Sequence, residues 1–338
     1  MKKIQIAQIG VGHDHALVVL DNVLKQNDLF EVVGFAVPEC EKETFSDRIE
    51  TYKKIIPLKS VDEILNDPEI QAVLIETEEV NLTKYALMAA EKGLHIHMDK
   101  PGGTDLALFQ KLIDTAKKNG CVFHTGYMYR YNSNILSAME KIKNGDLGEI
   151  YSVEAQMSCW HKKEKKQWLE RFPGGMLFYL GCHLIDIIVR IQGIPDEIIP
   201  LSVSTGAEGT TAKDFGMAVL KYKNGVSFAK TTASECGGFN RRQVVIAGTK
   251  GTIEIKPLEY IQNGDETLLY SDKKEVSGFE WHAKGETKTT APYDRYDAMM
   301  QAFSRYVHGE AKNPWDYDYE LQLFKILLNA CGEPVEYV

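Results

Sequence analysis

Residues 4–16 read Ile-Gln-Ile-Ala-Gln-Ile-Gly-Val-Gly-His-Asp-His-Ala, and this stretch decides the fold. An apolar strand reaches Gly10-Val11-Gly12 and then continues into a helix. Glycine has no Cβ, so the backbone can turn tightly and a ligand can approach it. The free N–H groups of the following helix suit a pyrophosphate. The dinucleotide fingerprint is G-x-G-x-x-G/A. Here His15 holds the third position and Ala16 comes one residue late, so the pair of glycines also fits a turn without a ligand.

The composition is that of an ordinary globular protein. The chain has 338 residues, of which 44% are hydrophobic and 26% charged, and its net charge is −9. This length predicts two domains. The acidic balance argues against a nucleic-acid partner, which needs a basic surface. The six cysteines are widely spaced and form no C-x-x-C pair, as is typical of reduced thiols in a cytosol.

No segment predicts secretion or membrane insertion. Few apolar residues precede Gly10, and they are too few for the apolar region of a signal peptide. The longest apolar run, residues 176–189, contains His183 and Asp186 and is too short to cross a bilayer. We therefore expect a cytoplasmic protein with no membrane partner.

Residues 1–126 predict a doubly wound parallel sheet of the Rossmann type. Strand-like runs at 30–37, 70–75, 95–99 and 121–125 alternate with helical segments. We expect Ser60 and Thr104 each to cap the start of a helix and Gly93 to end one. In such sheets the ligand lies at the carboxyl ends of the strands. The glycine turn, Val37, Glu76 and Lys100 all follow strands, so we expect them to face one crevice and to bind a dinucleotide.

Residues 127–338 predict an α+β domain with a large, mostly antiparallel open sheet. Residues 150–157 alternate as a half-buried strand does. Asn224-Gly225 and Asn263-Gly264 are typical of tight hairpin turns. Helices are expected at 132–144, 293–307 and 318–331. An apolar face of this sheet that no helix covers is typical of a subunit interface, so we expect a homodimer or homotetramer.

The acid that usually binds the adenosine ribose is missing from its place after the second strand. Val37 stands there, followed by Pro38 and Glu39. Glu39 either reaches the ribose or is a solvated loop acid. Because Glu39 and Glu41 would both repel a 2′-phosphate, the sequence favours NAD over NADP.

Two further stretches carry chemistry. One is His97-Met98-Asp99-Lys100-Pro101, and the other is the glycine-led segment 174–186, which contains Tyr179, His183 and Asp186. Together with the glycine turn, they resemble the Gfo/Idh/MocA oxidoreductases over nearly the whole chain. Gly126 to Arg130 and Gly248 to Ile253 add to the resemblance. It implies a Rossmann domain, a bound nicotinamide dinucleotide and hydride transfer on sugars, polyols or related compounds.

The resemblance also implies roles for individual residues. Lys100 matches the catalytic lysine of the family's E-K-P motif, where an ammonium stabilises charge on the substrate oxygen. His183 matches the histidine that takes the hydroxyl proton, work that suits its ordinary pKa of about 6.5. Asp186 shares a helix face with His183 and either orients the imidazole or makes a helix-surface hydrogen bond. The cofactor is expected to contact residues on the strand-end turns, namely Gly10, Gly12, His13, His15, Glu39, Glu76, Asp99, Lys100 and Pro101.

Three positions depart from the family pattern. Many members have an aspartate four residues before the histidine, where this chain has Tyr179. A phenol is uncharged at neutral pH, so Tyr179 either donates a hydrogen bond to substrate in the catalytic site or packs. Asp99 replaces the glutamate of E-K-P, and Thr83 stands where many members have a histidine. These changes leave the reaction more open than the cofactor.

Other candidates carry less weight. The pairs His13/His15 and His95/His97 lack a third ligand at a recognisable spacing, so we predict no metal site. Residues 161–166 form a basic stretch, which by default is a solvated loop and otherwise gathers an acidic or phosphorylated substrate. Three residues are candidates for contact with a small-molecule substrate: Tyr127, Arg130 and Trp160.

The sequence thus supports three functions. The first is an NAD-dependent dehydrogenase that acts on a sugar, a polyol or a derivative of either. The second is a dinucleotide-binding sensor or regulator without dehydrogenase activity, which Tyr179 and Val37 motivate. The third uses bound NAD for redox-assisted elimination without net formation of NADH.

Overall fold

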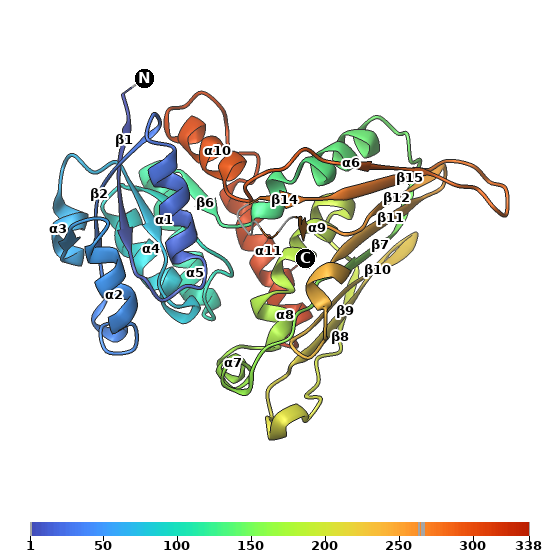
Figure 1. Ribbon diagram of the computed structural model, residues 1–338, viewed down its shortest axis with the longest axis horizontal. Coiled ribbons are helices and arrows are strands. Elements are labelled where there is room, and N and C mark those ends of the chain that lie inside the picture. The colour runs from blue at the N-terminus through green and yellow to red at the C-terminus, as the bar shows by residue number, and fades with distance from the viewer. Residues whose placement is uncertain (1, 263, 265–267, 338) are drawn as a thin grey trace. The chain divides into compact units, whose positions relative to one another are not determined.

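The computed structural model describes residues 2–262, 264 and 268–337, which form two compact units (Figure 1). The first unit contains Met1–Tyr127 and Tyr296–Phe324, and the second contains Met128–Arg295 and Lys325–Val338. None of the helices in the described part is long and apolar enough to cross a membrane.

The first unit is built on a six-stranded parallel sheet, as predicted. Its strands are β1 (Ile4–Ile9), β2 (Phe30–Ala36), β3 (Leu58–Lys59), β4 (Ala72–Ile75), β5 (His95–Met98) and β6 (Phe123–Thr125). They lie in the order β3-β2-β1-β4-β5-β6. The chain therefore leaves β1 toward one edge of the sheet and returns to its other side at β4. In this topology the crevice that binds a ligand opens between the carboxyl ends of β1 and β4.

Helices connect these strands. They are α1 (Ala16–Lys25), α2 (Ser46–Lys53), α3 (Val61–Asn66), α4 (Leu82–Glu91) and α5 (Leu106–Asn119). The capping box predicted at Ser60 is confirmed, because its hydroxyl accepts from the N–H of Glu63 while the Glu63 carboxylate accepts from the N–H of Ser60. Thr104 was the wrong cap for α5. Asp105 caps it, with its carboxylate accepting from Leu108, because the helix starts one residue later.

The segment Tyr296–Phe324 groups with the first unit, although the sequence predicts a second domain that runs over 127–338. Its helix α10 (Asp297–Val307) buries Met299, Met300 and Phe303 completely or nearly so. The Phe303 ring stacks on His124 of β6 at 5.3 Å between ring centroids. An amphipathic pattern predicts that a helix is buried, but not which sheet it covers. Helix α11 (Tyr317–Ala330) then crosses the division between Phe324 and Lys325.

The second unit contains the large, mostly antiparallel sheet that the sequence predicts. Its order is β16-β15-β12-β11-β7-β10-β9-β8, and only β7 and β10 pair in parallel among its described strands. The strands are β7 (Ile150–Gln156), β8 (Glu197–Pro200), β9 (Phe215–Tyr222), β10 (Gly225–Thr232), β11 (Gln243–Gly248), β12 (Gly251–Ile255), β15 (Asp272–Val276) and β16 (Glu286–Thr289). The hairpin predicted at Asn224-Gly225 joins β9 to β10. The one predicted at Asn263-Gly264 includes a residue outside the described ranges. A separate two-stranded ribbon pairs β13 (Tyr260–Ile261) with β14 (Leu269–Tyr270).

Helices cover one face of this sheet. They are α6 (Ser133–Lys143), α8 (Met176–Tyr179) and α9 (Cys182–Gln192). The basic stretch at 161–166 is not the loop that was predicted, because Lys163–Trp168 forms the short helix α7. The Lys166 ammonium is buried there and pairs with Glu208 at 3.0 Å. Burial of a lysine with its partner is a tertiary feature that a run of charges does not reveal.

The glycine turn packs against the loop that follows β4. Gly10 has φ +96°, and a Cβ placed on it would lie 2.4 Å from the backbone nitrogen of Thr77. Glycine is therefore required at this position for both its backbone conformation and its lack of a side chain. The turn after β1 and the loop after β4 meet closely at the carboxyl edge of the sheet.

Two substitutions separate these two requirements. Gly93 also has a positive φ, +77°, but nothing lies within 4 Å of a Cβ placed there. We expect Gly93→Ala to lower the free energy of unfolding by about 1 kcal/mol, the cost of the backbone conformation alone. Gly10→Ala should cost roughly 3 kcal/mol or more, because it adds overlap with Thr77. Urea unfolding followed by circular dichroism measures both, and equal costs would contradict the close approach.

Candidate functional site

A buried carboxylate bridges the crevice between β1 and β4. Glu41 lies in a 3₁₀ turn after β2 and has no exposed surface. Its Oε2 accepts from the Val11 N–H at 2.9 Å, and its Oε1 accepts from the Glu78 N–H at 2.6 Å. Burial raises the pKa of Glu41 above its ordinary 4.5, against the lowering effect of these backbone N–H groups. The Glu41 carboxyl group thus occupies the point at which the loops after β1 and β4 present backbone N–H donors.

Arg48 of α2 fixes the same turn through its carbonyl groups. Its guanidinium donates to the carbonyl oxygens of Val11, Gly12 and His13 at 2.9, 3.0 and 3.1 Å. The His13 N–H donates to the Glu76 carbonyl at 3.0 Å. The N–H groups of Val11 and His13, which a pyrophosphate would use, are therefore engaged by the protein itself. A dinucleotide that binds this turn has to displace the Glu41 carboxylate.

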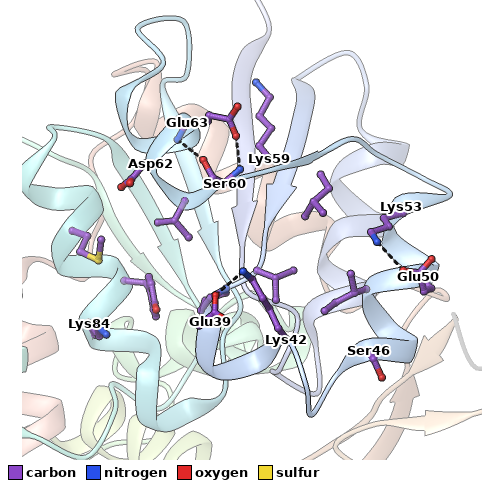
Figure 2. Close-up of a pocket in the computed structure, with 17 residues that line it drawn as sticks. Glu39, Lys42, Ser46, Glu50, Lys53, Lys59, Ser60, Asp62, Glu63 and Lys84 are labelled. Carbon is purple, nitrogen blue, oxygen red and sulfur yellow. Dashed lines mark hydrogen bonds and ion pairs between the residues drawn. The ribbon is translucent and has the colours of Figure 1, made fainter.

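A cavity of about 850 Å³ opens beyond the carboxyl end of β2 (Figure 2). Its apolar wall includes Val37, Ile49, Leu58, Tyr85 and Met88, and its size and lining fit an adenosine. Charged side chains surround it in roughly equal numbers of each sign: Glu39, Lys42, Glu50, Lys53, Lys59, Asp62, Glu63 and Lys84.

Glu39 lies at this cavity, away from the glycine turn. Its carboxylate pairs with Lys42 at 2.6 Å, and its side chain is 87% exposed. Figure 2 shows this pair between the loop after β2 and the cavity. Of the two acids expected to repel a 2′-phosphate, Glu41 faces inward and Glu39 is balanced by a lysine. The electrostatic basis for preferring NAD is therefore smaller than the sequence indicates.

A second cluster of the first unit joins histidines with carboxylates. His13 and His15 from the turn after β1 meet Asp99, which follows β5, at 3.3 and 3.0 Å between Nδ1 and Oδ2. Glu76 and Glu79, from the segment after β4, approach the His13 ring at 3.8 and 3.6 Å. His15 has the most exposed side chain of the five at 19%, and the other four are buried.

Burial controls the charges in this cluster. Desolvation lowers the pKa of His13 to about 3, so its imidazole is neutral at physiological pH. Burial and the neighbouring Asp99 raise the pKa of Glu76 well above 4.5. Burial would also raise the pKa of Asp99, but His13, His15 and Lys100 together hold it below its ordinary value. Asp99 is thus favoured as a carboxylate and Glu76 as a neutral acid, and the Lys100 ammonium acts on both groups.

Lys100 follows Asp99 and is buried with 2% of its surface exposed. Its N–H donates to Asp99 Oδ1 at 2.7 Å, and its carbonyl oxygen lies 3.1 Å from Nε2 of His13. Pro101 follows through a cis peptide bond and is also buried. The backbone around Lys100 is therefore fixed by the same histidine and aspartate that form the cluster.

In the second unit, His183 lies in the first turn of α9 and is buried. The Tyr129 ring contacts it edge-on, with 5.1 Å between ring centroids. The Tyr129 hydroxyl donates to Glu259 at 2.6 Å, and Arg295 and Arg242 also donate to that carboxylate. Burial would raise the pKa of Glu259, but the two arginines lower it below 4.5. A buried ionised carboxylate thus fixes the tyrosine that contacts His183.

Tyr179 ends α8, three residues before α9 begins, and is buried. Its ring packs edge-on against Trp168 at 5.3 Å, and the Lys165 ammonium lies 4.6 Å from its centroid. The His161 ring is 6.3 Å away. Tyr179 therefore belongs to an aromatic and cationic cluster with α7, whereas Trp160 is half exposed.

Arg130 and Asp186 form a buried ion pair. The guanidinium donates twice to Asp186 Oδ1, at 3.0 and 2.8 Å, and both residues are 1% exposed. Asp186 therefore has a partner that was not considered from the sequence, Arg130. Tyr127 lies at the end of the first unit and is also buried.

The structure therefore brings together five of the candidate residues of the first unit: His13, His15, Glu76, Asp99 and Lys100. Sequence reasoning missed Glu79, Arg48, Glu259 and the inward position of Glu41. Charged residues such as these are usually exposed, so no local pattern marks them as buried.

Comparison with known proteins identifies relatives of both units. Residues 4–127 match the profile of the "Oxidoreductase family, NAD-binding Rossmann fold", and residues 135–254 match the "GFO/IDH/MocA C-terminal domain". The chain is 30% identical over 196 residues to the uncharacterized oxidoreductase YhhX of Escherichia coli, which is 58% of this chain and 55% of YhhX.

Two other relatives have named activities. The scyllo-inositol 2-dehydrogenase (NADP(+)) IolW of Bacillus subtilis is 23% identical over 183 residues, 52% of this chain and 51% of IolW. The 2,7-anhydro-N-acetylneuraminate hydratase of Escherichia coli is 24% identical over 210 residues, 59% of this chain and 55% of that protein. Each of these three alignments spans about half of the relative. The crystal structure of the aldose–aldose oxidoreductase from Caulobacter crescentus has the same fold, with a TM-score of 0.78 and 18% identity over 98% of both chains.

Removal of the Glu41 carboxylate tests its place in the crevice. We expect Glu41→Ala to lower the free energy of unfolding by about 2 kcal/mol, since it leaves the buried N–H groups of Val11 and Glu78 without their acceptor. Glu39→Ala is the matched control in the same 3₁₀ turn, and its effect should stay within about 0.5 kcal/mol because that side chain is exposed. Equal stability of the two variants in urea unfolding would show that Glu41 does not hold the turn.

Proposed function

Because the chain belongs to the Gfo/Idh/MocA oxidoreductase family, we propose that it transfers hydride between NAD and a sugar, a polyol or a sugar derivative. The observation that carries this proposal is the placement of Lys100. It is buried after β5, at the carboxyl edge of a parallel sheet, and both its N–H and its carbonyl are held by neighbouring side chains. A buried lysine on a fixed backbone at this edge is suited to stabilise charge on a substrate oxygen.

The cofactor proposal rests on the cavity beyond β2 and on the glycine turn. The cavity would hold the adenosine, with Glu39 near its ribose, and the turn at Gly10 and Gly12 would face the pyrophosphate once Glu41 moves. His13, His15, Glu76, Asp99 and Pro101 would lie along the remainder of the cofactor. NAD rather than NADP stays our proposal, and it is tested by supplying each in turn, since IolW is named for NADP.

Bound NAD supplies the acceptor for the hydride, and the proposal assigns the other steps to side chains. Lys100 donates a hydrogen bond to the reacting oxygen of the substrate. His183 takes the hydroxyl proton and is held by the Tyr129–Glu259 pair, which limits rotation of the rings that contact it. The buried position of both residues favours the exclusion of water from the groups that they act on. Tyr179 would contact the substrate, whereas Arg130 and Asp186 support α9 through their ion pair.

A redox-neutral reaction is the second candidate. One relative is named a hydratase, and Tyr179 here replaces the aspartate that the family pattern has beside the histidine. A reaction of this class would add or remove water with no net change in the cofactor. It would consume substrate without any rise in the absorbance of reduced cofactor.

Turnover of a panel of sugars and inositols tests the assigned roles. Lys100→Met and His183→Asn should each lower kcat by about 100-fold or more, because each removes a group that stabilises charge or moves a proton. His282→Ala, which changes an exposed histidine, is the control and should keep full activity. Reduced cofactor is followed by absorbance and products by mass spectrometry, so the dehydrogenase and redox-neutral candidates are separated.

Turnover that is unaffected in both variants would remove Lys100 and His183 from the mechanism. Saturating cofactor binding without turnover of any substrate would favour the sensor or regulator that the sequence also allows.

We further propose that the chain forms a homo-oligomer through the open face of its second-unit sheet. Helices α8 and α9 cover the face that carries Ala218, Leu220 and Ala229, all fully buried. The residues that alternate with these along the strands point to the opposite face and are partly exposed. The apolar ones are Phe215, Met217, Val219, Val226, Phe228 and Val245. Glu154 and Lys230 lie among these apolar residues on the same face. A partly exposed face with this many apolar residues is typical of a subunit interface.

Sedimentation velocity tests this interface. Wild-type protein should sediment as a dimer or tetramer, and Val219→Lys should shift it toward monomer, because the ammonium would be buried between subunits. Val18→Lys, which adds the same charge at an exposed valine of α1 in the first unit, should leave the assembly unchanged. A monomeric wild-type protein would overturn the proposal.

A further inference from the structure

Three separate loops of the first unit place potential metal ligands around one point. His13 and His15 come from the turn after β1, Glu76 from the end of β4 and Asp99 from the end of β5. Ligand atoms of His13, His15 and Asp99 all lie within 4.8 Å of one another. The sequence predicted no metal site because no third ligand follows the two histidines at a recognisable spacing. The fold supplies that ligand from a residue 84 positions away from His15.

The separations agree with coordination of one small cation. Asp99 Oδ2 is 3.0 Å from Nδ1 of His15 and 3.3 Å from Nδ1 of His13. Two ligands that each bind a divalent ion at about 2.0–2.2 Å lie roughly 3 Å apart when they are neighbours in its coordination sphere. The two imidazoles would have to move closer to each other, and Glu76, now 3.8 Å from His13, would have to move toward the ion. His15 is the most exposed of these ligands, at 19%.

Groups outside the cluster already orient the ligands. Nε2 of His13 lies 3.1 Å from the Lys100 carbonyl oxygen, which can accept its proton and leave Nδ1 to the cluster. The Lys100 N–H donates to Asp99 Oδ1 and leaves Oδ2 for the cluster. Metal-binding histidines nearly always donate their second ring N–H in this way, and the bond fixes the tautomer. In this arrangement Nδ1 accepts a 3.1 Å hydrogen bond from the His15 N–H, which a metal ion would replace.

A second, independent observation is the Glu76 carboxylate. The residue has no exposed surface, and neither oxygen has a hydrogen-bond partner among the described residues. Its Oε2 lies 3.8 Å from Nδ1 of His13, on the side of the cluster. A buried carboxylate without hydrogen bonds is costly, and such groups are usually paired or bound to a metal. The Lys100 ammonium offsets part of that cost, and a divalent ion at the cluster would offset more of it.

We propose that His13, His15 and Asp99 bind one divalent transition-metal ion, with Glu76 as a fourth ligand. Two imidazoles with carboxylates select zinc and similar ions over magnesium, which prefers oxygen ligands and water. The proposal goes beyond the oxidoreductase activity, although the same four residues are proposed to lie along the cofactor, and its test requires neither cofactor nor substrate. A bound dication would also offset the negative charge of the cluster.

Metal titration tests the site without reference to activity. Untagged full-length protein, freed of metal by a chelator, is titrated with Zn²⁺ by calorimetry and with Co²⁺ by visible absorption. We expect one equivalent of each to bind and Mg²⁺ to compete only weakly. His15→Ala and Asp99→Asn should weaken Zn²⁺ binding by at least about tenfold, and the Co²⁺ absorption bands should disappear. His282→Ala, at an exposed histidine, should leave both unchanged.

Glu76→Gln gives a readout that a purely structural role would not produce. It keeps the size and shape of the neutral acid but removes the carboxylate that would bind the ion, so the metal-free variant should melt at a temperature close to that of wild-type protein. The same variant should bind Zn²⁺ more weakly and gain less thermal stability from it. The proposal is overturned if no stoichiometric binding occurs, or if His15→Ala and Asp99→Asn bind Zn²⁺ as wild-type protein does. Loss of binding in His282→Ala would also overturn it, because the ion would then sit at the surface.

Discussion

The close contact between the loops after β1 and β4 is the constraint on which the rest of the first unit depends. Gly10 can approach Thr77 only because it has no Cβ, and Glu41 then joins the two loops by accepting from Val11 and Glu78. Arg48 holds the carbonyl groups of the same turn. Because this turn is fixed, the next residues, His13 and His15, are directed at Asp99. The cofactor turn and the histidine cluster are thus consequences of one backbone arrangement.

Charge makes the two sites interdependent. Glu41, Glu76, Glu79 and Asp99 are all buried near the end of the parallel sheet, and a pyrophosphate would add further negative charge. Ionisation of so many neighbouring carboxyl groups in a low-dielectric setting is costly unless cations balance it, and the raised pKa values of Glu41 and Glu76 reflect that cost. Lys100 is one such cation. A metal ion at His13, His15 and Asp99 would be another, so that the proposed cation site favours the proposed cofactor site in the same crevice. Displacement of Glu41 toward solvent would lower the repulsion further.

The sequence was sufficient for the architecture but not for the interior of the site. Strand–helix alternation, the capping box at Ser60 and the hairpin at Asn224-Gly225 are local signals, and the sheets that they predict are present. The helix α10 was expected at nearly the right residues, yet its attachment to the first unit depends on long-range packing of Phe303. Similarly, the lysine-rich stretch before Trp168 became a helix with one buried lysine.

In the site, too, the sequence predicts what local motifs mark and misses what depends on the fold. Motif positions located Lys100, Asp99 and the glycine turn, because short motifs are local. The sequence places Glu41 after the second strand as an acid that would repel a 2′-phosphate, but only the fold shows that it points into the crevice. The cluster of His13, His15 and Asp99 likewise depends on residues from separate loops.

The most direct test of the account is hydrogen–deuterium exchange of the full-length protein with and without saturating NADH. The amides of Val11 and Glu78 are held by Glu41 in the free protein, and cofactor binding should transfer the Val11 amide to the pyrophosphate. The account predicts altered exchange in peptides that cover residues 9–16, 37–45 and 76–82. Unchanged exchange in all three peptides, with NADH binding demonstrated, would contradict a cofactor site at this crevice.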